Sequence, residues 1–281
     1  MNAPFSRNSN HRSAVHFITV DGDEIDRSSS FISLDVKPKM PNVTLIDDSH
    51  LPAGTKQRAL SFFDRYRDND VWIAVCASIG TAQVLVSYAA NLRRKINTQL
   101  VGEATREPVC HVFVVGPHHR LIHRAEEYGA IVHRVRGSVK DAIDEAQRLF
   151  GRSEREGHYP AMIPFGLEHP KFIRILTKVL VEQVEGLHLR NFDGKVFVAT
   201  GSGVLLKCLL QALPKAHFVA VQVGRYVQPQ DRVCVKKAPE RFSQPAERPP
   251  PYPSIAEYDA KVRRFVEEMG EDGDVVWNVA A

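Results

Sequence analysis

A glycine-rich turn, Thr200-Gly201-Ser202-Gly203-Val204, is the part of this sequence best suited to binding an anion. It follows the apolar run 195–198, which is typical of a buried strand, and precedes the apolar run 205–213, which is typical of a helix. Glycines let the backbone approach a ligand closely, and the N-terminus of a helix attracts negative charge. The turn is not a P-loop, and Leu206 stands where a dinucleotide fingerprint has its last Gly or Ala. We therefore expect it to hold the phosphate of a cofactor.

Lys56 offers the second reactive group, an amine that could form a Schiff base with a carbonyl. It lies in Gly54-Thr55-Lys56-Gln57-Arg58, at the start of a predicted helix. One strand and helix later, the segment 77–83 is rich in Ser, Thr and Gly and again joins a strand to a helix, so its N–H groups could bind a carboxylate. Ser78, Gly80 and Thr81 are expected to face the substrate.

Apolar runs of strand and helix length alternate along most of the chain, which predicts parallel sheets covered by helices on both faces. Strands are expected at 15–20, 31–36, 43–48, 71–77, 111–115, 131–135, 196–200, 218–223 and 275–279. Helices are expected from about residue 55 and at 81–96, 119–128, 139–150, 170–187, 205–213 and 255–269. Residues 225–253 are rich in Pro, Arg and Lys, and we interpret them as an excursion or flap.

The composition is that of a soluble globular protein, with 43% hydrophobic and 25% charged residues. The 4 cysteines and 12 histidines lack metal-ligand spacing, so no metal is expected. No signal peptide is apparent and no apolar run is long enough to span a membrane, which favours the cytoplasm. A net charge of +4 permits an acidic partner.

Together these segments resemble the fold-type II pyridoxal-phosphate enzymes, in the branch of 1-aminocyclopropane-1-carboxylate deaminase and D-cysteine desulfhydrase. Residues 52–58 are similar to the branch's Gly-Gly-Asn-Lys-x-Arg-Lys, residues 197–203 to its phosphate loop and residues 159–166 to its Ile-Pro-x-Gly stretch. Near the C-terminus, Tyr258-Asp259-Ala260-Lys261 looks like Tyr-Glu-Gly-Lys or Tyr-Thr-Gly-Lys, and residues 277–280 stand where the family has His-Thr-Gly-Gly. The resemblance runs from about residue 43 to the C-terminus.

The resemblance implies an α/β, tryptophan synthase β-like fold with two parallel-sheet domains. It places a large cofactor-binding domain at residues 1–65 and 138–281 and a smaller inserted domain at 66–137, and a homodimer is expected. Pyridoxal 5'-phosphate is the implied cofactor: Lys56 carries it, residues 200–204 hold its phosphate and Asp259 pairs with its ring nitrogen. Tyr258 would lie beside the ring, and Gly166 would contact the substrate.

The sequence departs from the family pattern at one of these segments. The family's Gln-Ser-Asn-His is Gly80-Thr81-Ala82-Gln83 here, so the Asn that contacts the ring hydroxyl and the Ser of deaminase chemistry are both absent. Val204-Leu205 also replaces the usual Gly-Thr of the phosphate loop. Ring-opening deamination is therefore not expected.

These residues predict a lyase that acts at the α-carbon of an amino-acid group. Decarboxylation is favoured because Asp259, paired with the ring nitrogen, would support a fully developed carbanion. A β-elimination of the deaminase or desulfhydrase type stays open. Two alternatives remain: a catalytically inactive binding protein of the same fold, and a Rossmann-like nucleotide-binding protein in which Lys56 is incidental.

The substrate is expected to be an amino acid, free or attached to nucleic acid. Viral relatives of this fold are thought to decarboxylate amino acids attached to thymidine in phage DNA, in the host cytoplasm. Residues 225–253 hold six basic and three acidic residues, a net charge of +3. A flap of this charge near the cofactor could contact DNA phosphates, which makes DNA an expected partner.

Overall fold

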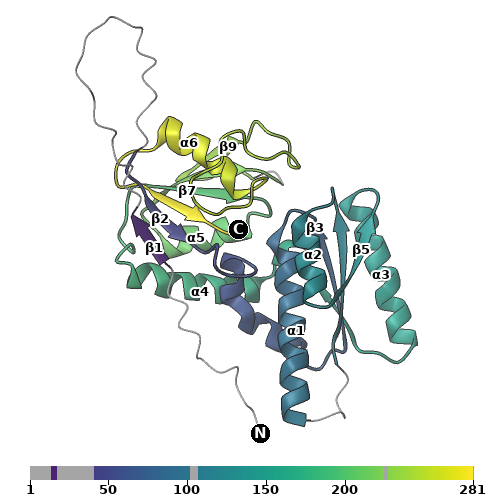
Figure 1. Cartoon of the computed structure of the whole chain (residues 1–281). Helices are drawn as coiled ribbons and strands as arrows, with labels where there is room; N and C mark the ends of the chain where they lie inside the picture. The colour runs from purple at the N-terminus through teal and green to yellow at the C-terminus, as the bar shows by residue number, and fades with distance from the viewer. Residues whose placement is uncertain (1–13, 18–40, 102–106, 225–226, 281) are drawn as a thin grey trace, which may run out of the picture.

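Two sheets, each covered by helices on both faces, form two units that lie side by side (Figure 1). The computed structural model describes residues 14–17, 41–101, 107–224 and 227–280. The predicted strand at 31–36 lies outside these ranges.

The larger unit contains a six-stranded sheet. Its strands lie in the order β1 (Ala14–Phe17), β2 (Thr44–Asp47), β10 (Val275–Asn278), β7 (Lys195–Thr200), β8 (His217–Gln222) and β9 (Val233–Lys237). Only β1 is antiparallel to its neighbour; the other pairs are parallel. The last strand of the chain, β10, therefore lies in the middle of the sheet, between β2 and β7.

Alternate residues of these strands bury opposite faces of the large sheet. Phe197, Val219 and Val276 pack beneath helix α6 (Val262–Met269). Their neighbours Val198 and Trp277 belong to the core under α4 (Pro170–Gly186) and α5 (Val204–Ala212). Figure 1 shows α6 on one side of this sheet and α4 and α5 on the other. Strands buried on both faces explain the continuous apolar runs in the sequence.

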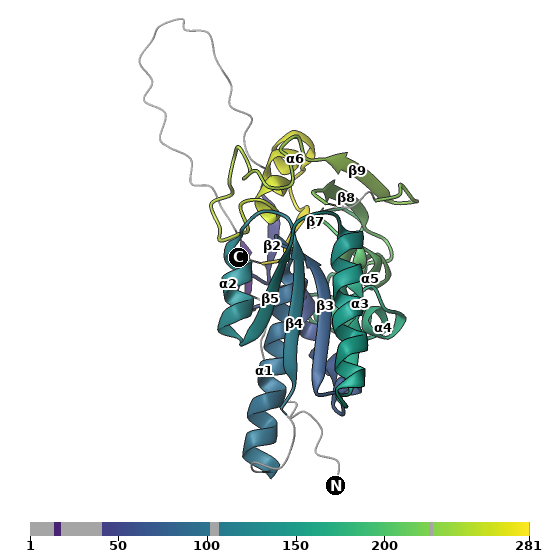
Figure 2. The same ribbon diagram turned by 90° about the vertical axis from the view of Figure 1, so that its right-hand side faces the viewer.

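The smaller unit contains four parallel strands in the order β5 (Ala130–Val135), β4 (Val109–Val115), β3 (Val71–Ala77) and β6 (Pro160–Ile163). Figure 2 shows α1 (Thr81–Val101) and α2 (Arg120–Glu127) on one side and α3 (Val139–Arg155) on the other. Alternation along β3 supplies both cores: Ile73 and Val75 pack with Ala146 of α3, whereas Trp72 and Ala74 belong to the core on the opposite face.

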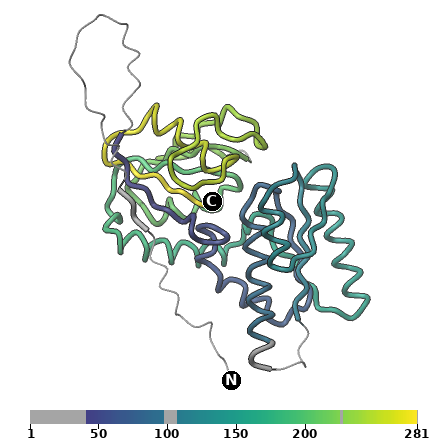
Figure 3. The backbone as a smooth tube through the Cα atoms, in the orientation of Figure 1, coloured from purple at the N-terminus to yellow at the C-terminus, as the bar shows by residue number. Residues whose placement is uncertain are grey.

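The chain crosses between the two units twice. After β2 it enters the small unit through the 3-10 helix η1 (Thr55–Tyr66), and after β6 it returns through the short helix η3 (Phe165–Leu167) and α4. Figure 3 traces this path. The segment that carries Lys56 therefore lies at the first crossing, next to the junction of the two sheets.

Three features differ from the sequence-based expectations. The strands β6 and β9 were not predicted: β6 is short and begins with a proline, which is tolerated at a strand's first residue, and β9 lies within the basic, proline-rich segment. Because β6 pairs with β3 and α3 packs on the same sheet, the smaller unit extends past residue 137, where we expected it to end. The predicted helix 255–269 is instead η4 (Asp259–Lys261) followed by α6.

Candidate active site

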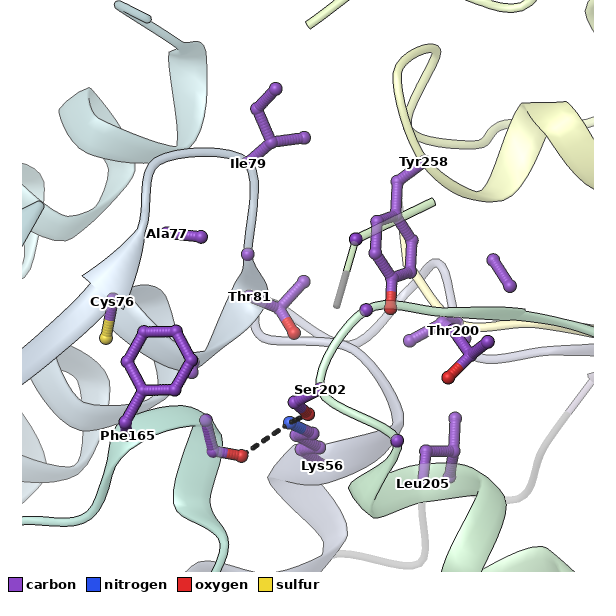
Figure 4. Close-up of a pocket in the computed structure, with 18 of the residues that line it drawn as sticks. Lys56, Cys76, Ala77, Ile79, Thr81, Phe165, Thr200, Ser202, Leu205 and Tyr258 are labelled. Atoms are coloured by element: carbon purple, nitrogen blue, oxygen red, sulfur yellow. Dashed lines mark hydrogen bonds between the residues drawn. The ribbon is translucent and has the colours of Figure 1, made fainter. Parts of the chain in front are cut away.

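A pocket of about 850 Å³, including its mouth, lies where the carboxyl ends of β3 and β7 face each other across the junction. This is the usual location of ligands in parallel α/β sheets. Figure 4 shows its walls, to which both units contribute. The lining residues are Lys56, Cys76, Ala77, Ile79, Gly80, Thr81, Ala82, Phe165, Gly166, Ala199, Thr200, Gly201, Ser202, Gly203, Leu205, Gly224, Phe242, Tyr258 and Val279.

The last strand of the large sheet holds the turn that carries Lys56. The Thr55 N–H donates to the carbonyl of Val279 at 3.0 Å, and Thr55 Oγ1 accepts from Trp277 Nε1 at 3.2 Å. Gly54 has a φ of +65°, and a Cβ there would lie 2.4 Å from the Val279 oxygen. Only glycine fits this position, so the turn and β10 are built to lie against each other.

The amine of Lys56 points into the pocket (Figure 4). It donates to the carbonyl of Gly166 at 2.8 Å and to Ser202 Oγ at 3.2 Å. Burial lowers the pKa of Lys56 from 10.5 to about 8, because a charged amine loses its hydration there. A substantial part of the amine is therefore neutral, and nucleophilic, close to physiological pH.

The glycine-rich turn lies on the opposite wall, between β7 and α5. Gly203 precedes the first residue of α5 and has a left-handed φ of +79°. The first turn of a helix has N–H groups without intrahelical partners, and these point toward the pocket end of α5. Thr200 Oγ1 is buried and has no hydrogen-bond partner, although Thr200 lines the pocket. A buried hydroxyl without a partner is costly, and an anion in the turn could supply one.

Two glycines, Gly201 in the turn and Gly224 beside it, allow neighbouring segments to approach the turn closely. A Cβ on Gly224, which follows β8, would lie 3.0 Å from the Cα of Gly201. A Cβ on Gly201 would lie 3.0 Å from the hydroxyl of Tyr258. Gly224 was not predicted, but it could have been, since it follows the strand paired with β7 at the same sheet edge.

Tyr258 and Asp259 take different positions relative to the pocket. Tyr258 lines it, and burial and the nearby Asp259 raise the pKa of its phenol, so the group stays protonated. Asp259 is buried and does not line the pocket; its Oδ1 accepts from the N–H of Val279 at 3.3 Å and its Oδ2 has no partner. Burial raises the pKa of Asp259 well above 3.8, which favours the neutral carboxyl.

The segment after β3 is only partly in the pocket. Gly80 and Thr81 line it, at the start of α1. Ser78 does not, contrary to our expectation that it would face the substrate. The Gly80 N–H donates to the carbonyl of Ala77, which turns the chain there, and Ser78 Oγ faces Gly116, where a Cβ would lie 2.5 Å away.

Two hydrogen bonds connect α2 of the small unit to segments that carry pocket residues. His119 Nε2 lies 3.1 Å from Glu257 Oε2, and Glu257 precedes Tyr258. Arg124 donates to the carbonyl of Pro52 at 3.3 Å, in the turn before Lys56. These contacts cross the junction, so the two units are joined beside the pocket.

Comparison with solved structures identifies the fold to which this arrangement belongs. No protein-family model matches the sequence, and no curated protein matches it. Among solved structures, a homologue of ACC deaminase superposes with a TM-score of 0.60 and 17% identity, over 84% of this chain and 83% of that chain. The chain has the fold of the fold-type II pyridoxal-phosphate enzymes.

Two further structures of this fold support that assignment. O-ureido-L-serine synthase superposes with a TM-score of 0.59 and 12% identity, over 87% of this chain and 85% of that chain. The O-acetylserine-dependent cystathionine β-synthase of Helicobacter pylori superposes with a TM-score of 0.57 and 12% identity, over 96% of this chain and 93% of that chain. The predicted fold-type II architecture with two parallel sheets is thus confirmed.

Within this fold, the structure brings together most of the residues singled out in the sequence. Lys56, Gly80, Thr81, Gly166, Thr200, Gly201, Ser202, Gly203 and Tyr258 all line the one pocket. Ser78, Val204 and Asp259 do not, although Val204 begins the helix behind the turn. Several apolar residues of the wall were not predicted to line a site; Phe165, Phe242 and Val279 are examples.

The described ranges contain neither a metal-binding cluster nor a membrane-spanning helix. No group of three or more His, Cys, Asp or Glu residues is placed to hold a metal ion there. Among the described helices, none combines the length and the apolar character that crossing a membrane requires.

Proposed function

We propose that the protein is a pyridoxal-phosphate-dependent lyase that acts at the α-carbon of an amino-acid group. The observation that carries the proposal is the placement of Lys56, with its lowered pKa, in one pocket with an anion-binding turn. The fold supports it, because the solved structures that superpose on this chain are pyridoxal-phosphate enzymes.

The residues present fit this cofactor. Its phosphate would accept hydrogen bonds from the N–H groups of the turn and from Thr200, whose buried hydroxyl has no partner. Gly201 and Gly224 leave space that a side chain would fill. When bound, pyridoxal phosphate withdraws electrons from the substrate's α-carbon, so that a bond to that carbon can break.

The chain's own groups would perform three tasks. Lys56, whose amine is partly neutral, would hold the cofactor covalently, and once the substrate has freed it the amine would move a proton at the α-carbon. The N–H groups at the start of α1, near Gly80 and Thr81, would bind the substrate carboxylate. Tyr258, held as a neutral phenol, would pack beside the ring.

Decarboxylation and elimination are both open, and the position of Asp259 bears on the choice between them. Decarboxylation was favoured because Asp259 was expected to pair with the ring nitrogen, yet its carboxyl bonds to the Val279 backbone and does not line the pocket. Asp259 therefore gives decarboxylation no advantage, and we give elimination equal weight. Product analysis separates the two: carbon dioxide and an amine from decarboxylation, ammonia and a 2-oxo acid from elimination.

The proposal is tested by the absorption spectrum of the purified protein with pyridoxal phosphate. A yellow protein whose cofactor becomes fixed by borohydride to the peptide holding Lys56 is expected. Lys56→Ala should remove this label, and Lys215→Ala, a change of an exposed lysine on the same unit, should keep it. A colourless protein, or label on another lysine, would refute the proposal. Colour without turnover of any amino acid would indicate the inactive binding protein.

A substrate attached to DNA is the second candidate, supported by the position of one residue. Phe242, from the basic segment, lines the pocket, and its neighbour Arg241 is exposed, as is Lys237. Two other cations of the segment have partners within the chain: Arg232 donates to the carbonyls of Leu210, in α5, and Ala216, after it, and Arg248 pairs with Glu267 at 3.1 Å. DNA carrying an amino-acid-modified thymine should then bind more weakly as salt rises. Absence of binding at low salt would exclude this candidate.

A further inference from the structure

Few polar side chains line the pocket in the part of the chain that the structure describes. Of the described residues that line it, Lys56 alone carries a charge, and none is Asp, Glu, Arg or His. The remaining polar side chains are those of Thr81, Thr200, Ser202 and Tyr258, apart from the thiol of Cys76. A substrate whose own side chain is charged would therefore lose its hydration and, with Lys56 committed to the cofactor, find no ionic partner among the described wall residues, which is strongly unfavourable.

We propose that the site selects an amino-acid group with an uncharged side chain, and that Phe242 is the specificity-determining residue. This inference rests on the proposed function, since it assigns the substrate class of that same site. Ile79, Phe165 and Phe242 supply large apolar surfaces to the wall. Phe242 is distinct among them because it lies in the long loop that follows β9, whereas Ile79 lies in the short turn between β3 and α1 and Phe165 begins η3.

The loop that carries Phe242 is attached to the C-terminal helices by specific hydrogen bonds. Lys261 Nζ donates to the carbonyl of Arg241 at 2.9 Å, directly before Phe242. Arg263 donates to the carbonyl of Pro249 at 2.5 Å, further along the loop. The Arg241 N–H in turn donates to Gln244 Oε1 at 2.9 Å. The loop therefore has a defined path, and its position at residue 241 depends on Lys261.

Lys261 is a positioning residue in this arrangement. Lys261 as a residue is only 2% exposed, which is unusual for lysine, and its amine reaches the backbone next to Phe242 rather than solvent. It is also the lysine of the Tyr258-Asp259-Ala260-Lys261 motif, to which the proposed chemistry gives no task. We assign it the task of holding Phe242 in the wall.

The first experiment measures binding of amino acids to the cofactor-loaded protein by calorimetry. Native protein should bind leucine or norvaline at least tenfold more tightly than glutamate or lysine. Phe242→Arg should supply the missing cation and improve the glutamate-to-norvaline affinity ratio about tenfold or more. Phe242→Leu, which keeps an apolar side chain, is the matched control and should leave that ratio within about threefold of native.

The second experiment tests Lys261 without using activity. Lys261→Met keeps the apolar stem and removes the donor, so protease cleavage in the cofactor-free protein should increase within residues 238–250. Lys237→Met, a change of an exposed lysine in the same segment, should not have this effect. In the cofactor-loaded protein, Lys261→Met should change the leucine-to-glutamate affinity ratio as much as Phe242→Ala does. The double variant should change this ratio little further, because the two residues act through one contact.

The outcomes of these experiments distinguish the specificity inference from the proposed function. Equal affinity for charged and apolar amino acids, or no binding of any amino acid by protein that has taken up its cofactor, overturns the inference while leaving the cofactor assignment standing. An unchanged ratio in Phe242→Arg overturns the role of Phe242. Failure to take up pyridoxal phosphate refutes the proposed function instead, and the proteolysis comparison still tests Lys261.

Discussion

Ser202→Asp provides a quantitative test of the environment of Lys56. Ser202 Oγ lies 3.2 Å from Lys56 Nζ, so a carboxylate there would face the amine directly. An opposite charge at such a distance favours the charged amine and raises its pKa by about 1–3 units. The pKa of Lys56, about 8 in the native protein, should therefore rise toward the 10.5 of a free lysine.

The kinetic consequence follows from the neutral fraction of the amine. At pH 7, about one tenth of Lys56 is neutral with a pKa of about 8, against about one in three thousand for an ordinary lysine at 10.5. Attachment to an aldehyde should rise tenfold per pH unit below pH 8 and level off above it. In Ser202→Asp the levelling should occur 1–3 units higher, and the rate at pH 7 should fall about ten- to a thousandfold.

The assay uses pyridoxal without the phosphate, so that repulsion of the phosphate by the new carboxylate does not enter the rate. Ser202→Asn, of similar size and without charge, is the control and should keep the native pH profile. A native profile that rises steadily beyond pH 10 would show that burial does not lower the pKa of Lys56. Identical profiles for the Asp and Asn variants would show that the amine does not lie beside residue 202.

Three further changes test the neighbourhood of the site. Thr200→Val removes a buried hydroxyl that has no partner, so the free energy of unfolding of the cofactor-free protein, measured with denaturant, should rise by about 1 kcal/mol. The affinity of the same variant for pyridoxal phosphate should fall severalfold. Gly224→Val should cut cofactor affinity at least tenfold in spectroscopic titration with the circular dichroism unchanged, because even its Cβ would lie 3.0 Å from Gly201; unchanged affinity would move the phosphate elsewhere. His119→Ala removes the bond to Glu257 across the junction, and cofactor dissociation measured by stopped-flow should accelerate about fivefold; an unaltered rate would contradict a role for this contact.

Much of the fold could be predicted from the sequence because its strands are buried on both faces. Continuous apolar runs such as 71–77 show the strand directly, and the structure has β3 at those residues. The edge strands β6 and β9 escaped prediction because they are short and contain proline, lysine or other polar residues. Their pairing depends on the neighbouring strand rather than on a pattern of their own.

The candidate site was predictable where a residue's backbone setting determines its position. Lys56 and the turn 200–204 follow strands or begin helices, so their location at a sheet edge follows from the topology. Whether Ser78 and Asp259 line the pocket depends on the direction of their side chains. A local turn sets that direction for Ser78, and a hydrogen bond from the C-terminal backbone sets it for Asp259. Phe242 enters the wall from a loop, and a loop's path does not follow from periodicity.

The pocket wall takes Cys76 and Thr81 from one unit and Thr200 and Val279 from the other, which has a thermodynamic consequence. A ligand seated between them binds only when both units are folded and docked, so its binding free energy acts on the junction itself. At a hundredfold excess over its dissociation constant that contribution is about 2.7 kcal/mol. The cofactor-free chain should then melt in two calorimetric transitions and the loaded chain in one, and saturation with ligand would convert two folding units into a single cooperative one.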